Sequence, residues 1–211
     1  MNYKKGFTTA EVVITLGIIG ALAVILLPVL IQDRPNQEMI MFKKAYTQLS
    51  RAVNELINDD DFYPETELTS NIETNSGFGN NVEVVYHGKK FGGTDNDAKT
   101  KFCKLVAVKL NIRGEEKCDV DAQTLANGGH FITSDGIVWL MPINDFHGSE
   151  QEVTIDVNGS DGYNCFEGQS CKEPDRFTIK VSRQGLITLP NNGIELKYLN
   201  SENNTKKYKD Y

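Results

Sequence analysis

Apolar residues follow three different patterns along the chain, and each pattern predicts a different kind of element. A continuous run from Val12 to Ile31 contains twenty residues and no charge. At a rise of about 1.5 Å per residue, a helix of this length spans roughly 30 Å, the thickness of the hydrocarbon core of a bilayer. Lys4 and Lys5 precede the run, so we expect a single membrane pass with the N-terminus cytoplasmic and the C-terminal domain outside.

The second pattern predicts an amphipathic helix over residues 36–58. Its apolar side chains recur at steps of three and four residues, which places them on one helical face. Pro28 in the apolar run lacks a backbone donor and is expected to kink the preceding helix. The acidic stretch Asp59–Asp61 is expected to end the second helix as a solvated loop. The apolar face consists of Phe42, Ala45, Tyr46, Leu49, Ala52, Val53, Leu56 and Ile57.

The third pattern is a polar region followed by short alternating runs. Residues 64–97 are rich in Asn, Thr, Gly and Glu and predict a long loop with one strand-like stretch at Val82–Tyr86. A second helix is expected at about 97–110, with Asp95 or Asp97 as its cap. Residues of about 130–199 predict an antiparallel sheet, because apolar runs flank Gly-containing turns. The chain is therefore expected to have an α+β fold.

Composition limits the classes of partner. The chain has 211 residues, 22 of them basic and 29 acidic, and a formal net charge of −7. Affinity for nucleic-acid backbones comes from clustered Lys and Arg, so direct nucleic-acid binding is not expected. The nearest basic cluster, Lys206, Lys207 and Lys209, is interpreted as a solvated tail.

The four cysteines, Cys103, Cys118, Cys165 and Cys171, all follow the apolar run. If that run exports the rest of the chain, an even cysteine count in an oxidising compartment predicts two disulfides. Three connectivities are open, and we favour the local pairs 103–118 and 165–171 because each closes a short loop. A zinc site is disfavoured because no CxxC spacing occurs.

The N-terminal residues resemble those of type IV pilins and of the pseudopilins of type II secretion. Members of this family have a basic leader that ends in glycine, usually followed by phenylalanine, a glutamate at the fifth mature position and a long apolar helix. This chain has Gly6, then Phe7, and Glu11 is fifth counting from Phe7. Pro28 is the twenty-second residue on the same count, where many members also carry proline. Thr8, Thr9 and Ala10 replace the commoner Thr-Leu-Ile, which is a mild departure.

The resemblance implies a pilin fold and a function in assembly rather than catalysis. A prepilin peptidase would cleave after Gly6 and methylate the new amino group of Phe7. The parts would then be a leader (1–6), a membrane and filament-core helix (7–31) and an exported domain (32–211). Subunits would wait in the bacterial inner membrane until an assembly ATPase and a platform protein extract them into a periplasmic pseudopilus or a surface pilus.

Within such a filament, the resemblance gives Glu11 a partner. A carboxylate in an apolar core is tolerated only when it is paired, and Glu11 of one subunit would face the N-terminus at Phe7 of its neighbour. Pro28 would let the helix bend as it packs. The alternative is an uncleaved, signal-anchored binding protein or enzyme, which leaves Gly6, Phe7 and Glu11 without a role. No catalytic spacing supports an enzyme, because His87, His130 and His147 are scattered.

One loop carries a possible cation site. Asp156, Asn158 and Asp161 lie within six residues beside Gly159 and Gly162. Oxygen ligands at alternating positions in a glycine-containing loop suit calcium, and some major pseudopilins hold calcium in a loop of the sheet. Asx residues also form turns without a metal, and the spacing departs from an EF-hand. A plain turn is therefore favoured, and no cofactor is required.

Overall fold

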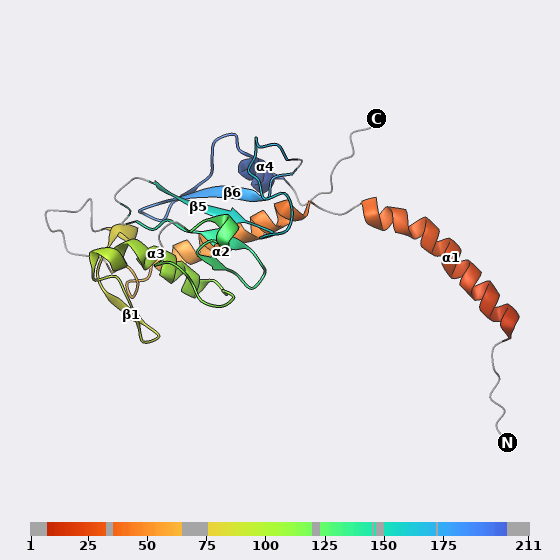
Figure 1. Ribbon diagram of the computed structural model, residues 1–211, viewed down its shortest axis with the longest axis horizontal. Helices are drawn as coiled ribbons and strands as arrows, with labels where there is room; N and C mark the ends of the chain where they lie inside the picture. The colour runs from red at the N-terminus through yellow and green to blue at the C-terminus, as the bar shows by residue number, and fades with distance from the viewer. Residues whose placement is uncertain are drawn as a thin grey trace, which may run out of the picture. The chain divides into compact units, whose positions relative to one another are not determined.

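A computed structural model describes residues 8–32, 36–64, 76–119, 123–144, 146, 150–171 and 173–201. The chain divides into two compact units. One contains the first helix, and the other spans Glu38–Glu202. The described residues form an α+β structure, as the apolar patterns predicted, and contain four α-helices and two antiparallel sheets (Figure 1).

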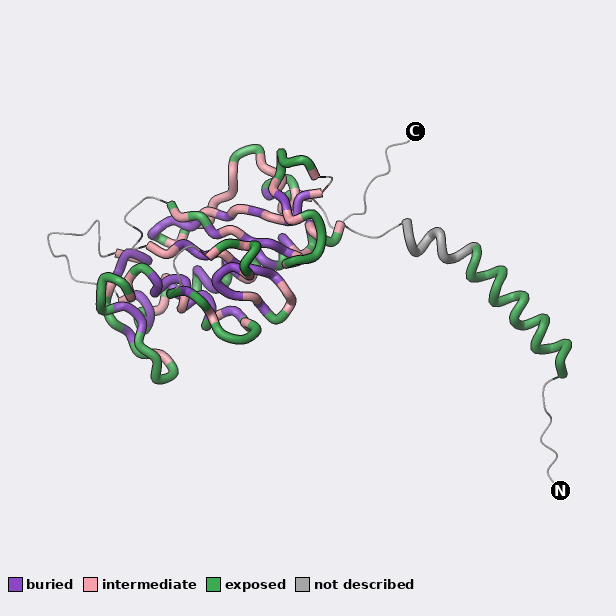
Figure 2. Tube along the Cα trace, in the orientation of Figure 1, coloured by how far each residue is buried: buried purple, intermediate pink, exposed green. Residues whose placement is uncertain are grey.

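The first unit contains helix α1 (Thr9–Gln32), whose side chains are described as far as Val24. These side chains are exposed along the whole described stretch (Figure 2). The large apolar ones are 44–72% exposed. Among the described residues, no helix combines the length and the apolar character needed to cross a membrane.

Helix α2 (Gln37–Ile57) begins the second unit and matches the amphipathic helix expected at 36–58. It ends just before the acidic stretch, where the carbonyl of Asp59 accepts hydrogen bonds from the amides of Phe62 and Tyr63. The stripe that sequence periodicity predicted is buried, apart from Tyr46 and Ile57, which are partly buried. The structure adds Met39, which was not predicted, so the buried residues of α2 are Met39, Phe42, Ala45, Leu49, Ala52, Val53 and Leu56.

The larger sheet has five antiparallel strands in the order β3-β4-β5-β6-β7, so each strand pairs with its neighbour along the chain. Gly-containing turns join neighbouring strands as expected, with Gly136 between β3 and β4 and Gly185 between β6 and β7. Alternate side chains of β6 are buried, which leaves one face of the sheet for the core. The strands are β3 (Phe131–Ile132), β4 (Val138–Leu140), β5 (Glu150–Asp156), β6 (Arg176–Ser182) and β7 (Ile187–Thr188).

The two edges of this sheet are covered differently. Residues 111–117 run beside β3, where the Arg113 amide donates to Ile132 and the Lys117 amide donates to His130. At the other edge, β7 has only two residues and is followed closely by Pro190. Short strands and proline are two devices by which proteins blunt a sheet edge.

The core lies between the apolar face of the sheet and helices α2 and α3 (Asp95–Lys109). Phe42 of α2 lies 4.7 Å from Phe177 of β6, measured between ring centroids. Trp139 is fully buried, as expected for a core residue. In Figure 2 the buried segments gather where α2, α3 and the sheet face one another.

The cap of α3 differs from the expectation. Thr94, not Asp95 or Asp97, is the N-cap, and its hydroxyl accepts the amide of Asp97. The hydroxyl also donates to the Asp97 carboxylate at 2.5 Å. The helix therefore starts two residues earlier than predicted, because the side chain of a threonine in extended backbone geometry accepts one of the first free amides of the helix.

Two elements were not expected from the sequence. The region 64–97 was expected to be a loop with one strand, but β1 (Val84–Tyr86) and β2 (Lys89–Phe91) form an antiparallel hairpin. His87 and Gly88 at its turn both have positive φ, as tight hairpin turns require. The predicted sheet region 130–199 ends in a helix, α4 (Ile194–Asn200). Two short 3-10 helices, η1 (Gly77–Gly79) and η2 (Leu125–Asn127), complete the described elements.

A lysine is buried between α3 and the β1–β2 hairpin. Lys101 is 1% exposed, and its Nζ donates to the carbonyls of Asn80 at 3.2 Å and Val82 at 2.9 Å. It also lies 4.3 Å from the ring centroid of Tyr63. No carboxylate among the described residues forms an ion pair with it. Burial therefore lowers the pKa of Lys101 to about 8.

This lysine predicts an unusual alkaline response. Between pH 8 and pH 10 the unfolded chain keeps the proton on Lys101 while the folded chain loses it, so the free energy of unfolding should rise with pH, by up to about 3 kcal/mol. Burial raises the pKa of Tyr63, which reverses the trend only above pH 10. Denaturant titrations from pH 7 to 9.5 measure the rise. The Lys101→Met variant should lack it, and an equal rise in that variant would refute the assignment.

Candidate functional site

The first candidate site is the N-terminal end of α1, where the resemblance places the assembly residues. The Glu11 carboxylate accepts the backbone amide of Thr8 at 2.7 Å and its hydroxyl at 2.9 Å. In return, the Glu11 amide donates to the Thr8 hydroxyl at 3.3 Å. This reciprocal pair is a capping box, which satisfies orphan amides at the start of a helix.

The capping box gives Glu11 a role within its own chain that the sequence interpretation missed. The signal was present, because threonine followed three residues later by glutamate at the start of an apolar helix is the capping-box pattern. The carboxylate is therefore held by hydrogen bonds in the single chain. Gly6 and Phe7, the expected processing and methylation residues, lie outside the described residues.

The expected kink at Pro28 is not seen as a break in α1, which is continuous from Thr9 to Gln32. A proline removes one backbone hydrogen bond and can be accommodated within a helix. The side chain of Pro28 is not among those described. Its expected part in filament packing stays a prediction.

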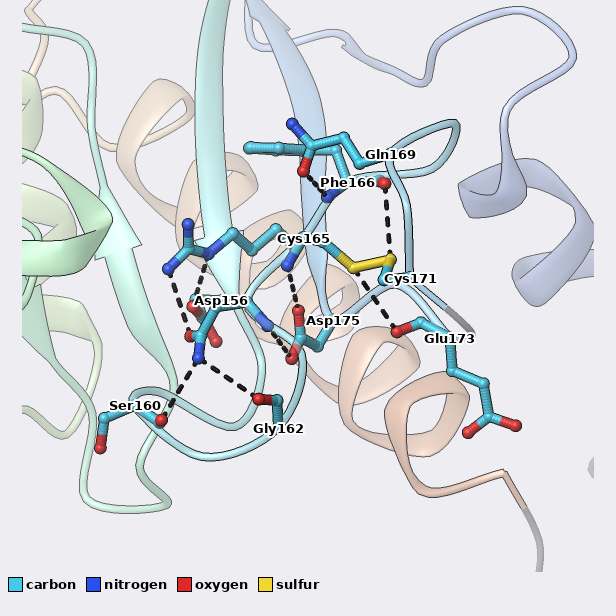
Figure 3. A network of polar contacts seen from close by, with 11 residues as sticks. Asp156, Ser160, Gly162, Cys165, Phe166, Gln169, Cys171, Glu173 and Asp175 are labelled. Atoms are coloured by element: carbon cyan, nitrogen blue, oxygen red, sulfur yellow. Dashed lines mark hydrogen bonds and ion pairs between the residues drawn. A yellow bond between two sulfur atoms is a disulfide. The ribbon is translucent and has the colours of Figure 1, made fainter.

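The second candidate site is the loop that follows β5 and carries two of the cysteines (Figure 3). The structure contains the two favoured disulfides, Cys103–Cys118 and Cys165–Cys171. The first pins α3 to the loop that follows it. The second closes a loop whose start is fixed by Asp175, a fully buried carboxylate. Asp175 accepts the amides of Asn164 and Cys165, each at 2.8 Å.

A second buried carboxylate lies beside Asp175. Asp156 is 1% exposed and forms an ion pair with Arg176, with 2.8 Å between Oδ2 and Nε. Burial raises the pKa of Asp156, and Arg176 opposes that shift. The Nη2 group of Arg176 also donates to Asn164 at 3.2 Å. The guanidinium is therefore held in one orientation by two side chains.

The three residues of the calcium prediction are not equivalent in the structure. Asp156 is buried against Arg176, whereas Asp161 is exposed. Oδ1 of Asp156 and Oδ1 of Asn158 are buried without a hydrogen-bond partner among the described residues. Within the same part of the chain, no group of three His, Cys, Asp or Glu side chains is arranged to bind a metal. Arg176 supplies a positive charge where a cation would, and calcium binding stays a prediction.

The cysteine loop also supports helix α4. The helix has no side-chain cap of its own, and Glu167 of the loop accepts the amide of Ile194 at 2.7 Å. Glu167 also pairs with Lys197 at 3.5 Å. In turn, Glu195 of α4 accepts the amide of Thr178 on β6. The loop thus positions α4. This helix contacts the part of β6 that is not paired with β7.

Histidines do not assemble a catalytic group in the described structure. His130 is buried, and its Nδ1 accepts the amide of Met141 at 3.0 Å. His87 lies in the β1–β2 turn, and His147 is outside the described residues. The expectation that the chain is not an enzyme stays a prediction.

A pocket of about 580 Å³ opens beside the second site. It lies between the end of the β5 loop, the β3–β4 hairpin and η2. Arg113 and Arg176 both line it, so the polar network of the cysteine loop reaches the surface there. In comparisons with known proteins, the chain matches no family model, no curated protein and no solved structure.

Proposed function

We propose that this chain is a non-enzymatic structural subunit of a type IV pilus-like or type II secretion filament. The observation that carries the proposal is the order Gly6, Phe7, Glu11 ahead of twenty uncharged residues. A prepilin peptidase would cleave after Gly6 and methylate Phe7. The inner membrane would hold the mature subunit, with the Glu38–Glu202 unit outside, until an assembly ATPase and platform protein extract it into a pseudopilus or pilus.

The exposure of α1 supports the proposal on physical grounds. Large apolar side chains along this helix are 44–72% exposed, and burying them against lipid or against other copies would be favourable. Glu11 is the one charged residue of the described helix. In the single chain it is satisfied by Thr8, and in a filament it would exchange that contact for the N-terminus of a neighbour.

Two substitutions separate the charge of Glu11 from its capping. Glutamine at the third helical position still completes a capping box but carries no charge. We expect Glu11→Gln and Glu11→Val both to lose most filament assembly, measured as the sedimentable, cross-linkable fraction in a reconstituted or native assembly system. Thr8→Ser, which retains a hydroxyl cap, serves as the matched control and should assemble. Assembly of Glu11→Gln at the normal level would contradict inter-subunit charge pairing.

The intact mass of the protein from native membranes tests the processing step separately. A chain that begins at Phe7 and carries one added methyl group is the expected result. A chain that begins at Met1 would overturn the filament proposal and favour the signal-anchored alternative.

A further inference from the structure

The two disulfides differ in how a reductant can reach them. Cys103 and Cys118 are both fully buried, so the bond between them lies within the core. Cys165 is buried as well, but Cys171 is partly exposed, and residues 167–170 between them are all exposed. Thiol–disulfide exchange requires a thiolate to contact a sulfur atom. The second disulfide is therefore the accessible one, and Cys171 carries the sulfur that a thiolate reaches.

The two ends of the loop that this disulfide closes are held unequally (Figure 3). The amide of Cys165 donates to the buried carboxylate of Asp175 at 2.8 Å, and its carbonyl accepts the amides of Asp175 and Arg176. The amide of Cys171 donates to the carbonyl of Gln169, which belongs to the same loop, at 2.7 Å. The disulfide therefore joins a loosely held end of the loop to a firmly held one.

The exposed part of this loop carries the cap of α4. Glu167 accepts the amide of Ile194 at 2.7 Å and pairs with Lys197 at 3.5 Å. The helix has only seven residues, and isolated helices shorter than about 12–15 residues are marginal in water. Helix α4 therefore depends on this cap and on its packing against the rest of the unit.

Helix α4 in turn contacts two elements that lie far from it in the sequence. The ring of Tyr198 lies 5.7 Å from that of Phe177 on β6 and 6.3 Å from that of Phe42 on α2, measured between centroids. The hydroxyl of Ser201, which follows the helix, donates to the sulfur of Met39 in the first turn of α2 at 2.8 Å. A change that begins in the cysteine loop can therefore reach β6 and the start of α2 through one short helix.

We propose that the Cys165–Cys171 disulfide is a redox switch that controls the packing of α4. The reductant is a dithiol: one of its thiolates attacks Sγ of Cys171, Cys165 leaves as a thiolate, and the second thiol closes the reagent into a cyclic disulfide. Two electrons pass from the dithiol to the protein, and the two protons of the dithiol end on the two cysteines. The freed loop carries Glu167 away from Ile194, and α4 separates from β6 and α2. The switch operates whether or not the chain forms a filament.

The test treats the full chain in mild detergent with increasing dithiothreitol under native conditions. Free thiols are trapped with iodoacetamide and located by peptide mass. We expect Cys165 and Cys171 to be alkylated while Cys103 and Cys118 remain bonded. Hydrogen exchange of the same samples, followed by mass spectrometry, should show residues 194–200 exchanging at least about tenfold faster after reduction, with α3 unchanged. Reduction of Cys103–Cys118 at the same dithiol concentration, unchanged exchange in α4, or an equal rise in α3 would each overturn the proposal.

Two variants of the loop test the coupling without breaking the disulfide. Glu167→Ala removes the cap of α4 and should speed exchange in residues 194–200 by about threefold or more in the absence of reductant. Ser170→Ala is the matched control, because Ser170 is exposed in the same loop and should change neither α4 nor the reduction of the disulfide. Equal exchange of α4 in Glu167→Ala and the wild-type protein would overturn the coupling through Glu167.

Discussion

Arg176→Gln is expected to lower the free energy of unfolding at pH 7 by about 3–5 kcal/mol. Asp156 is 1% exposed, and its only ion pair among the described residues is with Arg176. Removing the guanidinium leaves a charged carboxylate in the interior, and Asn164 also loses a donor. Urea titrations of the two proteins measure the difference. A loss below about 1 kcal/mol would show that water already reaches Asp156.

The same variant has a predicted pH dependence. Burial raises the folded pKa of Asp156 above its unfolded value even with Arg176 present, and the variant should raise it further. Between the pKa of Asp156 in the unfolded chain and its higher pKa in the folded chain, the folded chain binds a proton that the unfolded chain has lost. The contribution of Asp156 to the free energy of unfolding is therefore greatest at low pH and falls as pH rises. The deficit of Arg176→Gln should therefore shrink as pH is lowered from 7 toward 4.

A second change at this pair provides the control. In Asp156→Asn/Arg176→Gln both charges of the pair are absent, so residue 156 no longer titrates. We expect this double variant to be more stable than Arg176→Gln alone at pH 7. Its stability deficit relative to the wild-type protein should not shrink on acidification, whereas the deficit of Arg176→Gln should. A deficit in Arg176→Gln that is independent of pH would assign the loss to packing instead.

Phe42→Ala is expected to lower the free energy of unfolding by about 3–5 kcal/mol, the usual cost of truncating a fully buried phenylalanine. Phe42 is 0% exposed and contacts Phe177 of β6, and its ring lies 6.3 Å from that of Tyr198 on α4. The cavity would therefore open between a helix, the sheet and α4. Denaturant unfolding of the full chain in detergent measures the loss.

A nearby apolar residue is the matched control for this change. Ile40 lies on the same helix but is 39% exposed, so Ile40→Ala should cost less than about 1 kcal/mol. Hydrogen exchange at the Thr178 amide adds a local readout, because α4 supplies its acceptor through Glu195. Equal losses in the two variants would contradict the placement of Phe42 in the core.

Periodicity predicted the elements that bury one continuous face. Helix α2, helix α3 and the two β-hairpins of the larger sheet follow from apolar spacing and from glycine at the turns. Helix α4 could not be predicted in this way, because it has seven residues and takes its cap from Glu167, which lies 27 residues upstream. The β1–β2 hairpin was missed because Lys89 and Lys90 carry no strand pattern.

In the candidate sites, too, the sequence predicted some contacts and missed others. Cysteine spacing predicted both disulfides, since each closes a short loop. The partner of Asp156 lies 20 residues further along the chain, on the neighbouring strand, so local spacing suggested a cation rather than an arginine. Thr8 was given no role of its own in the sequence analysis, although its hydroxyl completes the cap around Glu11.

The covered edges of the five-stranded sheet affect whether associated copies of this chain can dissociate again. Residues 111–117 occupy the β3 edge, and β7, Pro190 and α4 blunt the β6 side. Among the described residues, the only uncovered edge that this sheet offers a neighbouring copy is the two-residue strand β7, too short to extend the sheet as happens in amyloid. Copies that associate through helices and side chains share no backbone ladder. We therefore expect any polymer of this chain to be reversible and to dissolve in detergent without unfolding its subunits.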